Sequence, residues 1–398
     1  MVSYKIHIGK LIIGNGNNLT DIKIGIKNGI IKELTEYNLK NKYKKEIDCS
    51  DYIAMPGLID AHSHLASVGS LTPETTVEYL TLKSIILAKK SLYSGVTTLG
   101  DAGAVGNSVF ALRQAINEKM IQAPRIKACG GMITMTGGRV VKGKKPGSSP
   151  YEVDGEDEAR RIARTLLMYK GADFLKLGAT GSMSNPLTGP THPQLNINEM
   201  RAVTEEAHKC NKMVHAHCYG ELGINNSLEA EVDVIVHGQS FSKQQIMEMK
   251  KKGTIFIPTL SAYQKYLIKY EAEEGKSVFN QSTQELIRQT EPNFKNALKN
   301  DLTIALGTDT SSRFENSFGK HAEELVHMVN YGMSEEKAIV VGTLNTAKAL
   351  GVDKKIGTLE EGKNADLLIL REDPTKDIKI LSQKEKIFTI ILDGEKIY

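Results

Sequence analysis

The stretch Met55-Pro-Gly-Leu-Ile-Asp-Ala-His-Ser-His-Leu65 determines both the predicted fold and the predicted site. Pro56-Gly57 marks a break, and the apolar residues after it predict a strand at Leu58–Ser63. Residues i and i+2 of a strand point to the same face, so the imidazoles of His62 and His64 converge where the strand ends. Two converging imidazoles suit a borderline divalent metal such as zinc. The alternative is a pair of histidines that are hydrogen-bonded within a turn.

The composition is that of an ordinary globular protein. Of 398 residues, 40% are hydrophobic and 25% charged, and 51 basic against 47 acidic residues leave a net charge of +4. No basic run predicts a nucleic-acid partner. No apolar stretch approaches the ~20 residues of a membrane span, and the first residues lack a signal-peptide core. Four scattered cysteines, without metal-ligand spacing, favour a reduced, cytoplasmic protein.

Both ends of the chain predict antiparallel strands. Residues 4–13 and 21–34 are β-branched and alternate in polarity, and the second stretch contains the turn Asn28-Gly29. Residues 365–370 and 387–398 have the same character. We therefore expect a small β-sandwich domain formed by both termini, over residues 1–55 and 353–398.

The middle of the chain, residues 56–352, alternates short apolar strands with amphipathic helices. A count of eight strands predicts an α/β fold of the (β/α)8 TIM-barrel type. Two connections are long: residues 134–155 are predicted to form a mobile loop, and residues 262–299 a helical lid. The predicted strands are Leu58–Ser63, Val96–Gly100, Arg125–Cys129, Asp173–Leu177, Met213–Cys218, Val232–His237, Thr254–Leu260 and Thr303–Thr308. The predicted helices are Val77–Ser94, Asp157–Lys170, Ile197–Lys209 and Lys243–Lys252.

Polar residues of metal-ligand type stand at the ends of five predicted strands. Active sites of such barrels lie at the carboxyl ends of the strands, so these side chains should meet. Considered alone, His237 could be a core histidine. The set comprises His62, His64, Lys176, His217, His237 and Asp309.

Lys176 is the most unusual member, because it lies inside an apolar strand. A buried lysine should be neutral or paired. A neutral amine can react with carbon dioxide to give a carbamate, an anion that can bridge two metals. The alternative is a salt bridge to Asp309, whose carboxylate can otherwise bind a metal and accept a proton from water.

The remaining histidines are less clearly placed. His215 and His217 share a face of one strand, and His217 is favoured as the ligand because it lies nearer the carboxyl end. His192 is a weak candidate for lining the pocket. Residues His7, His192, His208, His321 and His327 are predicted to lie on the surface or in loops.

Taken together, the motifs show that the sequence resembles the amidohydrolase superfamily. The resemblance covers the whole chain and points to the imidazolonepropionase-like metal-dependent hydrolases, which include prolidases and arginine/lysine carboxypeptidases. The matching stretches are Pro-Gly-Leu-Ile-Asp-Ala-His-Ser-His (56–64), Gly-Val-Thr-Thr (95–98), Gly-Ala-Asp-Phe-Leu-Lys-Leu-Gly-Ala-Thr-Gly (171–181), His-Cys-Tyr-Gly (217–220), His237, Gly-Thr-Asp (307–309), Asn-Thr-Ala (345–347) and residues 356–367.

The resemblance implies a site for two divalent metal ions, with zinc the expected metal. One ion would be held by His62, His64 and Asp309, and the other by His217 and His237. Carboxylated Lys176 would bridge them. The family's strand-5 and strand-6 ligands are separated by 20 residues, which His217 and His237 match. In dipeptide hydrolases of the family, the residue two after the strand-5 ligand holds the substrate carboxylate, and here that residue is Tyr219.

The chain departs from the family pattern at one position. Relatives often carry Thr-Gly-Gly-His after strand 3, whereas this chain has Thr136-Gly-Gly-Arg139. Arg139 does not donate a proton at ordinary pH, but it can polarise a carbonyl or bind a carboxylate. Lys142 and Arg313 would also suit an anion.

The expected activity is hydrolysis of a C–N amide bond by a metal-bridged hydroxide. The expected substrate is a small molecule, either an N-acyl amino acid or a dipeptide with a free carboxylate. Asp309 and Arg139 are the expected catalytic residues, and Tyr219 and Arg139 the expected substrate-binding residues. Opening of a cyclic amide or deamination of a heterocycle on the same scaffold is the alternative. Homo-oligomerisation is left open.

Overall fold

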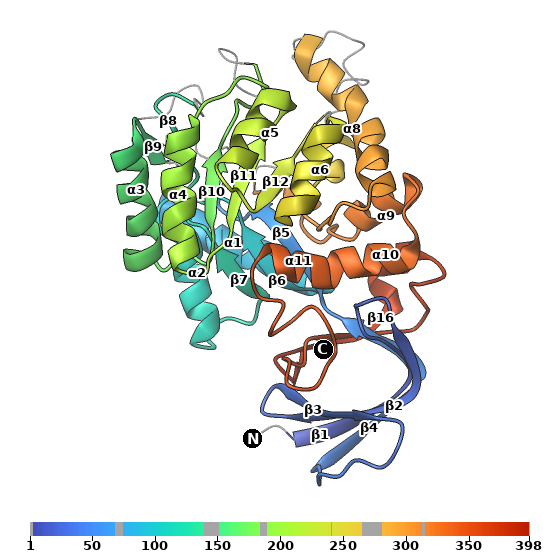
Figure 1. The fold of residues 1–398 in the computed structure, drawn as a ribbon. Helices are drawn as coiled ribbons and strands as arrows, with labels where there is room; N and C mark the ends of the chain where they lie inside the picture. Colours follow the sequence, from blue (N-terminus) through green and yellow to red (C-terminus); the bar gives the residue numbers. More distant parts are fainter. Residues whose placement is uncertain are drawn as a thin grey trace.

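The computed structural model describes residues 3–67, 75–138, 151–183, 189–239, 241–264, 281–312 and 315–397. Its strands form one mainly antiparallel sheet from the two ends of the chain and two parallel sheets from the middle. Helices surround the parallel strands, and the sheet from the termini lies below them (Figure 1).

The terminal sheet joins segments from opposite ends of the sequence. Its seven strands run in the order β17-β16-β15-β4-β1-β2-β3, so β4 and β15 form the junction between the two ends. All neighbours are antiparallel except β1 and β4. The strands belong to one continuous curved sheet, in place of the two facing sheets expected for a sandwich (Figure 1). Their bounds are Ser3–Ile12 (β1), Asn18–Lys27 (β2), Ile30–Thr35 (β3), Lys45–Pro56 (β4), Leu367–Leu370 (β15), Ile387–Leu392 (β16) and Glu395–Lys396 (β17).

Alternating apolar residues give this sheet its own buried cluster. Ile6 and Ile8 of β1, Ile24 of β2, and Leu367 and Ile369 of β15 are almost fully buried and belong to it. Side chains two residues apart share one face of a strand, which explains why the alternation in sequence produces an apolar face. The division of the chain at residues 55 and 353 stays a prediction.

The parallel strands of the middle form two separate sheets in the described residues. One has the order β14-β5-β6-β7 and the other β13-β12-β11-β10-β8-β9. The first consists of Leu58–His64 (β5), Val96–Asp101 (β6), Arg125–Ala128 (β7) and Thr310–Ser311 (β14). The second consists of Ile133–Met135 (β8), Tyr151–Val153 (β9), Leu175–Gly178 (β10), Val214–Cys218 (β11), Val234–His237 (β12) and Ile255–Ile257 (β13).

Individual backbone hydrogen bonds connect the two sheets at their edges. The N–H of Asp173 donates to the carbonyl of Ala128 over 2.8 Å. On the other side, residues 303–309 bond to β13 through Phe256 and to β5 through Ala61 and His62. The prediction of an eighth strand at Thr303–Thr308 is therefore wrong. In the described structure this segment is not a regular strand and makes one isolated bridge, at Ile304. The sequence also missed β8, β9 and β14.

Helices occur where the periodicity predicted them, and their capping residues explain their ends. Asn196 and Glu199 form a capping box at the start of α4, and Ser242 and Gln245 form one at the start of α6. Gly253 ends α6 in the left-handed region. The α-helices are Val77–Leu92 (α1), Ser108–Asn117 (α2), Glu156–Arg164 (α3), Ile197–Lys209 (α4), Gly220–Glu229 (α5), Lys243–Lys252 (α6), Gln281–Lys299 (α8), Glu323–Asn330 (α9), Glu335–Val340 (α10) and Thr346–Ala349 (α11). Short π or 3-10 segments cover Thr165–Tyr169, Val341–Asn345, Glu315–Ser317, Ile378–Ser382 and Lys384–Lys386.

A buried ion pair connects the terminal sheet to the parallel strands. The guanidinium of Arg125, at the start of β7, donates to Asp366 over 2.8 Å and to Asp393 over 2.5 Å. Burial raises the pKa of Asp366, although the charge of Arg125 opposes this shift. Arg125 therefore compensates a carboxylate that the packing has removed from water.

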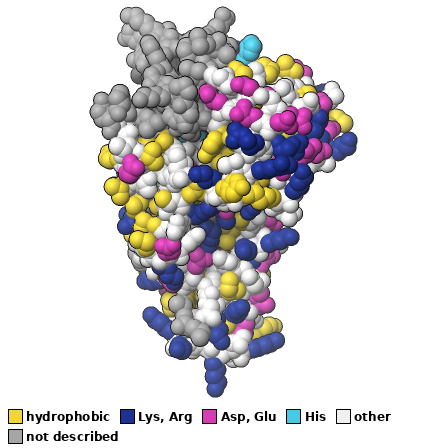
Figure 2. Space-filling view, turned by 90° about the vertical axis from the view of Figure 1, so that its left-hand side faces the viewer, with side chains coloured by type: hydrophobic (Ala, Val, Ile, Leu, Met, Phe, Trp, Pro, Cys, Tyr) yellow, Lys and Arg dark blue, Asp and Glu magenta, His cyan; other side chains and the backbone are white. Residues whose placement is uncertain are grey.

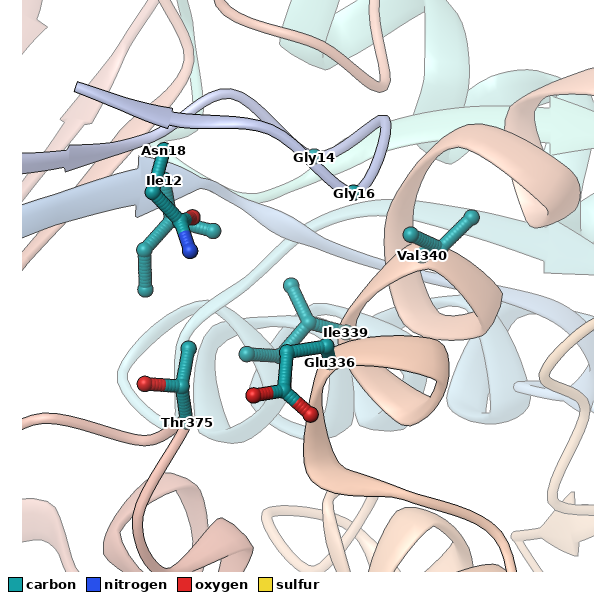
Figure 3. Close-up of a pocket in the computed structure, with 8 residues that line it drawn as sticks. All are labelled: Ile12, Gly14, Gly16, Asn18, Glu336, Ile339, Val340 and Thr375. Carbon is teal, nitrogen blue, oxygen red and sulfur yellow. The ribbon is translucent and has the colours of Figure 1, made fainter.

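Charge patches, apolar helices and cavities are the features of the described surface that would mark a second site. Basic and acidic side chains are intermingled over the face in Figure 2. Within the described residues, no helix is long and apolar enough to cross a bilayer. A cavity of about 10 Å³ between Ile12, Glu336 and Thr375 (Figure 3) has room for about one water molecule.

Candidate metal centre

Strand register brings the predicted ligands of the second sheet side by side. Gly178 of β10 pairs with His217 of β11, and Cys218 pairs with His237 of β12. His217 and His237 therefore lie at neighbouring strand ends, and Lys176, which pairs with His215, lies two residues before the end of β10. The other sheet contributes His62 and His64 from the end of β5.

His62, His64 and Asp309 form a compact group. The Nε2 atom of His62 lies 3.5 Å from Oδ1 of Asp309, and Nε2 of His64 lies 3.2 Å from the same oxygen. One ligand atom from each of the three lies within 4.8 Å of the others. Two imidazole nitrogens and a carboxylate oxygen at this spacing are a donor set that fits a divalent cation such as zinc.

His217 and His237 form a second pair beside this group. Their ring centroids are 4.5 Å apart, and the His237 ring is 5.5 Å from that of His62. Nε2 of His217 bonds to the carbonyl of Gly181 over 2.9 Å, and Nδ1 of His237 bonds to Thr259 Oγ1 over 2.8 Å. Each bond fixes the orientation of its ring and indicates which nitrogen would meet a metal.

Lys176 lies next to the first of these groups. Its side chain is completely buried, and its Nζ atom lies 3.5 Å from Nδ1 of His62. Asp309 pairs with His62 and His64, and a salt bridge between Lys176 and Asp309 stays an alternative prediction. The contact with His62 places Lys176 beside the first group.

Two ligands depend on unusual backbone conformations. His237 has a φ of 71° and Asp309 a φ of 52°, both in the left-handed region. Val234 and Val236 of β12 belong to one buried apolar cluster. With regular alternation along the strand, the side chain of His237 would point to the opposite face. The left-handed turn at His237 instead directs its ring toward His62 and His217. Such conformations cost about 1–3 kcal/mol and concentrate at functional sites.

Burial and neighbouring charges shift the pKa values of His62, His64 and Asp309. Burial lowers the pKa of His62 well below its usual value, and the charge of Lys176 adds to this effect. Burial acts to raise the pKa of Asp309, but hydrogen bonds from His62 and His64 outweigh it and lower this pKa strongly. Burial likewise opposes ionisation of His64, but Asp309 raises its pKa. Asp309 is thus ionised and His62 neutral, the forms in which both side chains bind metals.

Buried carboxylates hold the ligand-bearing strand ends in place. Asp60 accepts hydrogen bonds from the N–H of His62, from the N–H and hydroxyl of Thr308, and from Nδ1 of His321. It therefore ties the end of β5 to the residue before Asp309. Sequence reasoning assigned Asp60 no role, although a carboxylate inside an apolar strand is as unusual as Lys176.

Asp101 supports His64 in a similar way. It accepts from the N–H of Leu65 and Gly103, and the carbonyl of Gly103 bonds to Nδ1 of His64 over 3.0 Å. Burial raises the pKa of Asp101. The Nδ1 bond leaves Nε2 of His64 as the nitrogen directed toward Asp309.

Two further histidines, His321 and His215, are buried. His321 lies in the turn before α9, as the prediction of a surface or loop residue allows, but its side chain is buried between Asp60 and Ser91, so the expectation of a surface position is wrong. His215 is buried, with Nε2 bonded to the carbonyl of Ala349, and burial lowers its pKa to about 3. His215 thus faces the opposite end of the strands from His237.

Tyr219 lies within the candidate site, packed on the second histidine pair. Its ring stacks on His237 at 4.9 Å and 9°, and meets the edge of His217 at 4.9 Å. Arg139, Lys142 and Arg313 lie outside the described residues. The substrate-binding roles expected for Tyr219 and Arg139 stay predictions.

The two residues before Arg139 are anchored near the strand ends. Gly138 accepts a hydrogen bond from the Gln194 amide over 2.6 Å, and Gln194 also bonds to Thr134. Gly137 N–H donates to Glu152 over 3.1 Å. At residue 138, where this described segment ends, the chain is therefore close to β8 and to the end of β10.

Comparison with known proteins gives the family. The model of the amidohydrolase family matches residues 53–397. The ochratoxinase of Aspergillus niger is 28% identical, over 99% of this chain and 86% of the fungal protein. An imidazolonepropionase of Caldanaerobacter subterraneus is 25% identical, over 87% of this chain and 83% of that protein.

Solved structures agree with this assignment. A Xaa-Pro dipeptidase with methionine bound in its active site superposes with a TM-score of 0.87 and 29% identity, covering 99% of both chains. The structure of the A. niger ochratoxinase gives a TM-score of 0.86 and 26% identity, over 99% of this chain and 95% of that one. Such neighbours imply a TIM-barrel-type fold. The chain belongs to the amidohydrolase family, in the branch with these prolidase-like hydrolases.

Proposed function

We propose that the protein is a binuclear metal-dependent amidohydrolase. It hydrolyses a C–N amide bond in an N-acyl amino acid or dipeptide with a free carboxylate. The observation that carries the proposal is the convergence of His62, His64 and Asp309 beside buried Lys176. Similarity to a Xaa-Pro dipeptidase supports the choice of substrate class.

The ligands are shared between two cations, with zinc as the proposed metal. His62, His64 and Asp309 would hold one, His217 and His237 would hold the other, and Lys176, once carboxylated, would serve as a ligand shared by both. When bound, such ions supply a low-pKa water and polarise the scissile carbonyl.

The side chains of the protein do the remaining work. Asp309, ionised in the resting site, accepts the proton of the attacking water and returns it to the leaving nitrogen. Tyr219 holds the substrate carboxylate next to the His217–His237 pair. Arg139 places a fixed positive charge near the reacting carbonyl, where it stabilises the developing oxyanion.

Replacement of histidine by arginine at position 139 favours an anionic substrate. A guanidinium binds a carboxylate in two parallel hydrogen bonds, which an imidazole cannot do. Gly138 is anchored by Gln194 near the strand ends, which keeps the start of the segment carrying Arg139 close to the metal ligands.

The alternative is ring opening of a cyclic amide or deamination of a heterocycle. It is favoured by the similarity to an imidazolonepropionase, whose name denotes a heterocyclic substrate. It is disfavoured by Lys176, because mononuclear deaminases of the superfamily usually lack a lysine ligand on strand 4. Cytoplasmic location and homo-oligomerisation stay predictions from the sequence.

The test combines metal analysis with a substrate panel. Full-length protein is stripped with a chelator and reconstituted with Zn²⁺ and bicarbonate. It is then assayed on N-acyl amino acids, dipeptides, their carboxamide analogues and cyclic amides. We expect close to two metals per chain and turnover only of substrates with a free carboxylate. A metal count of zero refutes the proposal, and turnover confined to cyclic substrates supports the alternative.

A further inference from the structure

The turn after β13 determines how His237 is held. Thr259 has a φ of 51°, a conformation that a β-branched residue adopts only under constraint. In this conformation its hydroxyl lies 2.8 Å from Nδ1 of His237. A helical turn over residues 260–264 follows directly. The orientation of the His237 ring thus depends on a strained turn on the neighbouring strand.

A buried carboxylate from a distant helix clamps that turn. Glu324, in the first turn of α9, accepts the N–H of Leu260 at Oε1 and the N–H of Ser261 at Oε2, each over 2.7 Å. Its side chain is fully buried. A carboxylate that accepts the first N–H groups of a helical turn also interacts favourably with the turn's dipole.

We propose that Glu324 is a positioning residue for the cation held by His217 and His237. By clamping residues 260 and 261, it keeps Thr259 in its left-handed conformation and thereby holds the His237 ring in its metal-binding orientation. This inference rests on the proposed function. The hydrogen bonds of Glu324 go to Leu260 and Ser261, so its effect on His237 passes through Thr259.

The contact between two neighbouring strands explains why such a clamp is needed. Thr259 follows the end of β13 and His237 ends β12, and the hydrogen bond between their side chains fixes the ring of His237 relative to the next strand. Relaxation of Thr259 to an extended conformation would release backbone strain. Two hydrogen bonds to a charged acceptor oppose that relaxation.

The expected effect is on metal affinity rather than on the fold alone. Loss of a hydrogen-bond partner behind a ligating histidine typically weakens metal binding about 10- to 100-fold. Burial raises the pKa of Glu324 to about 7, and neighbouring Asp60 adds to this shift. Measurements are therefore made at about pH 8, where the carboxylate form accepts both N–H groups.

The test is Glu324→Gln, with Glu199→Gln as a matched control. Glu199 also accepts two backbone N–H groups, from Gly155 and Asn196, but it does so on the outer helix α4. Apo-protein is titrated with Co²⁺, whose visible absorption reports the ligand geometry of each ion. We expect Glu324→Gln to weaken the second ion about 10- to 100-fold and to leave the first unchanged. Glu199→Gln should lower thermal stability to a similar extent while retaining both ions.

A double-mutant cycle then tests the route through Thr259. Thr259→Val removes the hydroxyl and should weaken the same ion, whereas Thr259→Ser should retain wild-type affinity. Combined with Glu324→Gln, Thr259→Val should add little, because both changes break one path. If Glu324→Gln does not fold, Glu324→Asp, which shortens the reach by one methylene, takes its place.

The outcomes separate this inference from the proposed function. If the wild type binds two ions but Glu324→Gln binds both with unchanged affinity, Glu324 is structural only and the proposed function stands. Additive effects of the two changes, or a Thr259→Val variant with unaltered second-ion binding, would also overturn the inference. A wild type without a second ion would instead refute the binuclear site.

Discussion

Replacement of Asp60 by alanine or asparagine tests how a buried carboxylate stabilises the fold and supports the metal ligands. Asp60 is fully buried and accepts from His62 and from the N–H and hydroxyl of Thr308. A carboxylate can only accept, so Nδ1 of His321 carries the hydrogen in its 2.7 Å bond to Asp60. Asp60→Ala leaves all four donors without their acceptor.

The structure predicts different costs for the two variants. A buried donor left unpaired costs about 1–3 kcal/mol, so Asp60→Ala should lose about 4–5 kcal/mol, allowing for partial relaxation. In Asp60→Asn, Oδ1 retains two contacts. The amide can donate to the hydroxyl of Thr308 and, after His321 shifts its hydrogen to Nε2 facing Ser91, to Nδ1 of His321. The loss should then be about 1–2 kcal/mol.

Thermal unfolding of metal-free protein measures the difference. For 398 residues, an unfolding entropy of about 2 cal/mol/K per residue makes a loss of about 1 kcal/mol equal to about 1.2 °C. Asp60→Ala should therefore lower the Tm by about 5–6 °C, and Asp60→Asn by about 2 °C. Asp60→Ala should also weaken the ion held by His62, His64 and Asp309. An Asp60→Ala variant whose Tm lies within about 1 °C of wild type would refute the reasoning. An Asp60→Asn variant that is less stable than Asp60→Ala would refute it as well.

Three further changes test other parts of the site and the fold. Lys176→Ala should abolish binding of the second ion and turnover, with partial rescue by formate or acetate, and Lys176→Arg should not be tolerated. Two retained metals and wild-type turnover in Lys176→Ala would make this lysine structural. Arg139→Ala should lower kcat/KM by ~10², the loss of one charged donor, and unchanged kinetics would remove it from the site. Arg125→Met leaves Asp366 buried and unpaired, at a cost of about 3 kcal/mol. Because burial favours the protonated form of Asp366, this cost should shrink as the pH falls, and thermal unfolding at two pH values checks it.

Local chemistry explains which features could be predicted from the sequence. The bounds of α4 and α6 were predicted without error because both helices begin at capping boxes and their last turns end the apolar period. Lys176 stood out because a charge inside an apolar strand is costly unless it is used. The curved terminal sheet was foreseen as strands, but the sequence does not encode whether those strands form one sheet or two.

Tertiary contacts explain what was missed. His321 and Glu324 lie on a helix or just before it, with ordinary neighbours in sequence, and their burial arises only when this segment packs against the strand ends. The segment 303–308 has the composition of a strand, but it divides its hydrogen bonds between Phe256 on one side and β5 on the other. No periodic pattern reveals that division.

The pairing of β4 with β15 has a consequence for synthesis of the chain. In the sheet order, β1–β4 are contiguous, and β4 meets on its other side a strand made more than 300 residues later. During translation, therefore, one edge of β4 waits with unpaired N–H and C=O groups until nearly the whole chain has been made. Closure of this edge is the most non-local pairing between the described strands, and a slow, late step is the expected result. A nascent chain that stalls before β15 would present this edge to any neighbouring chain that could add a strand.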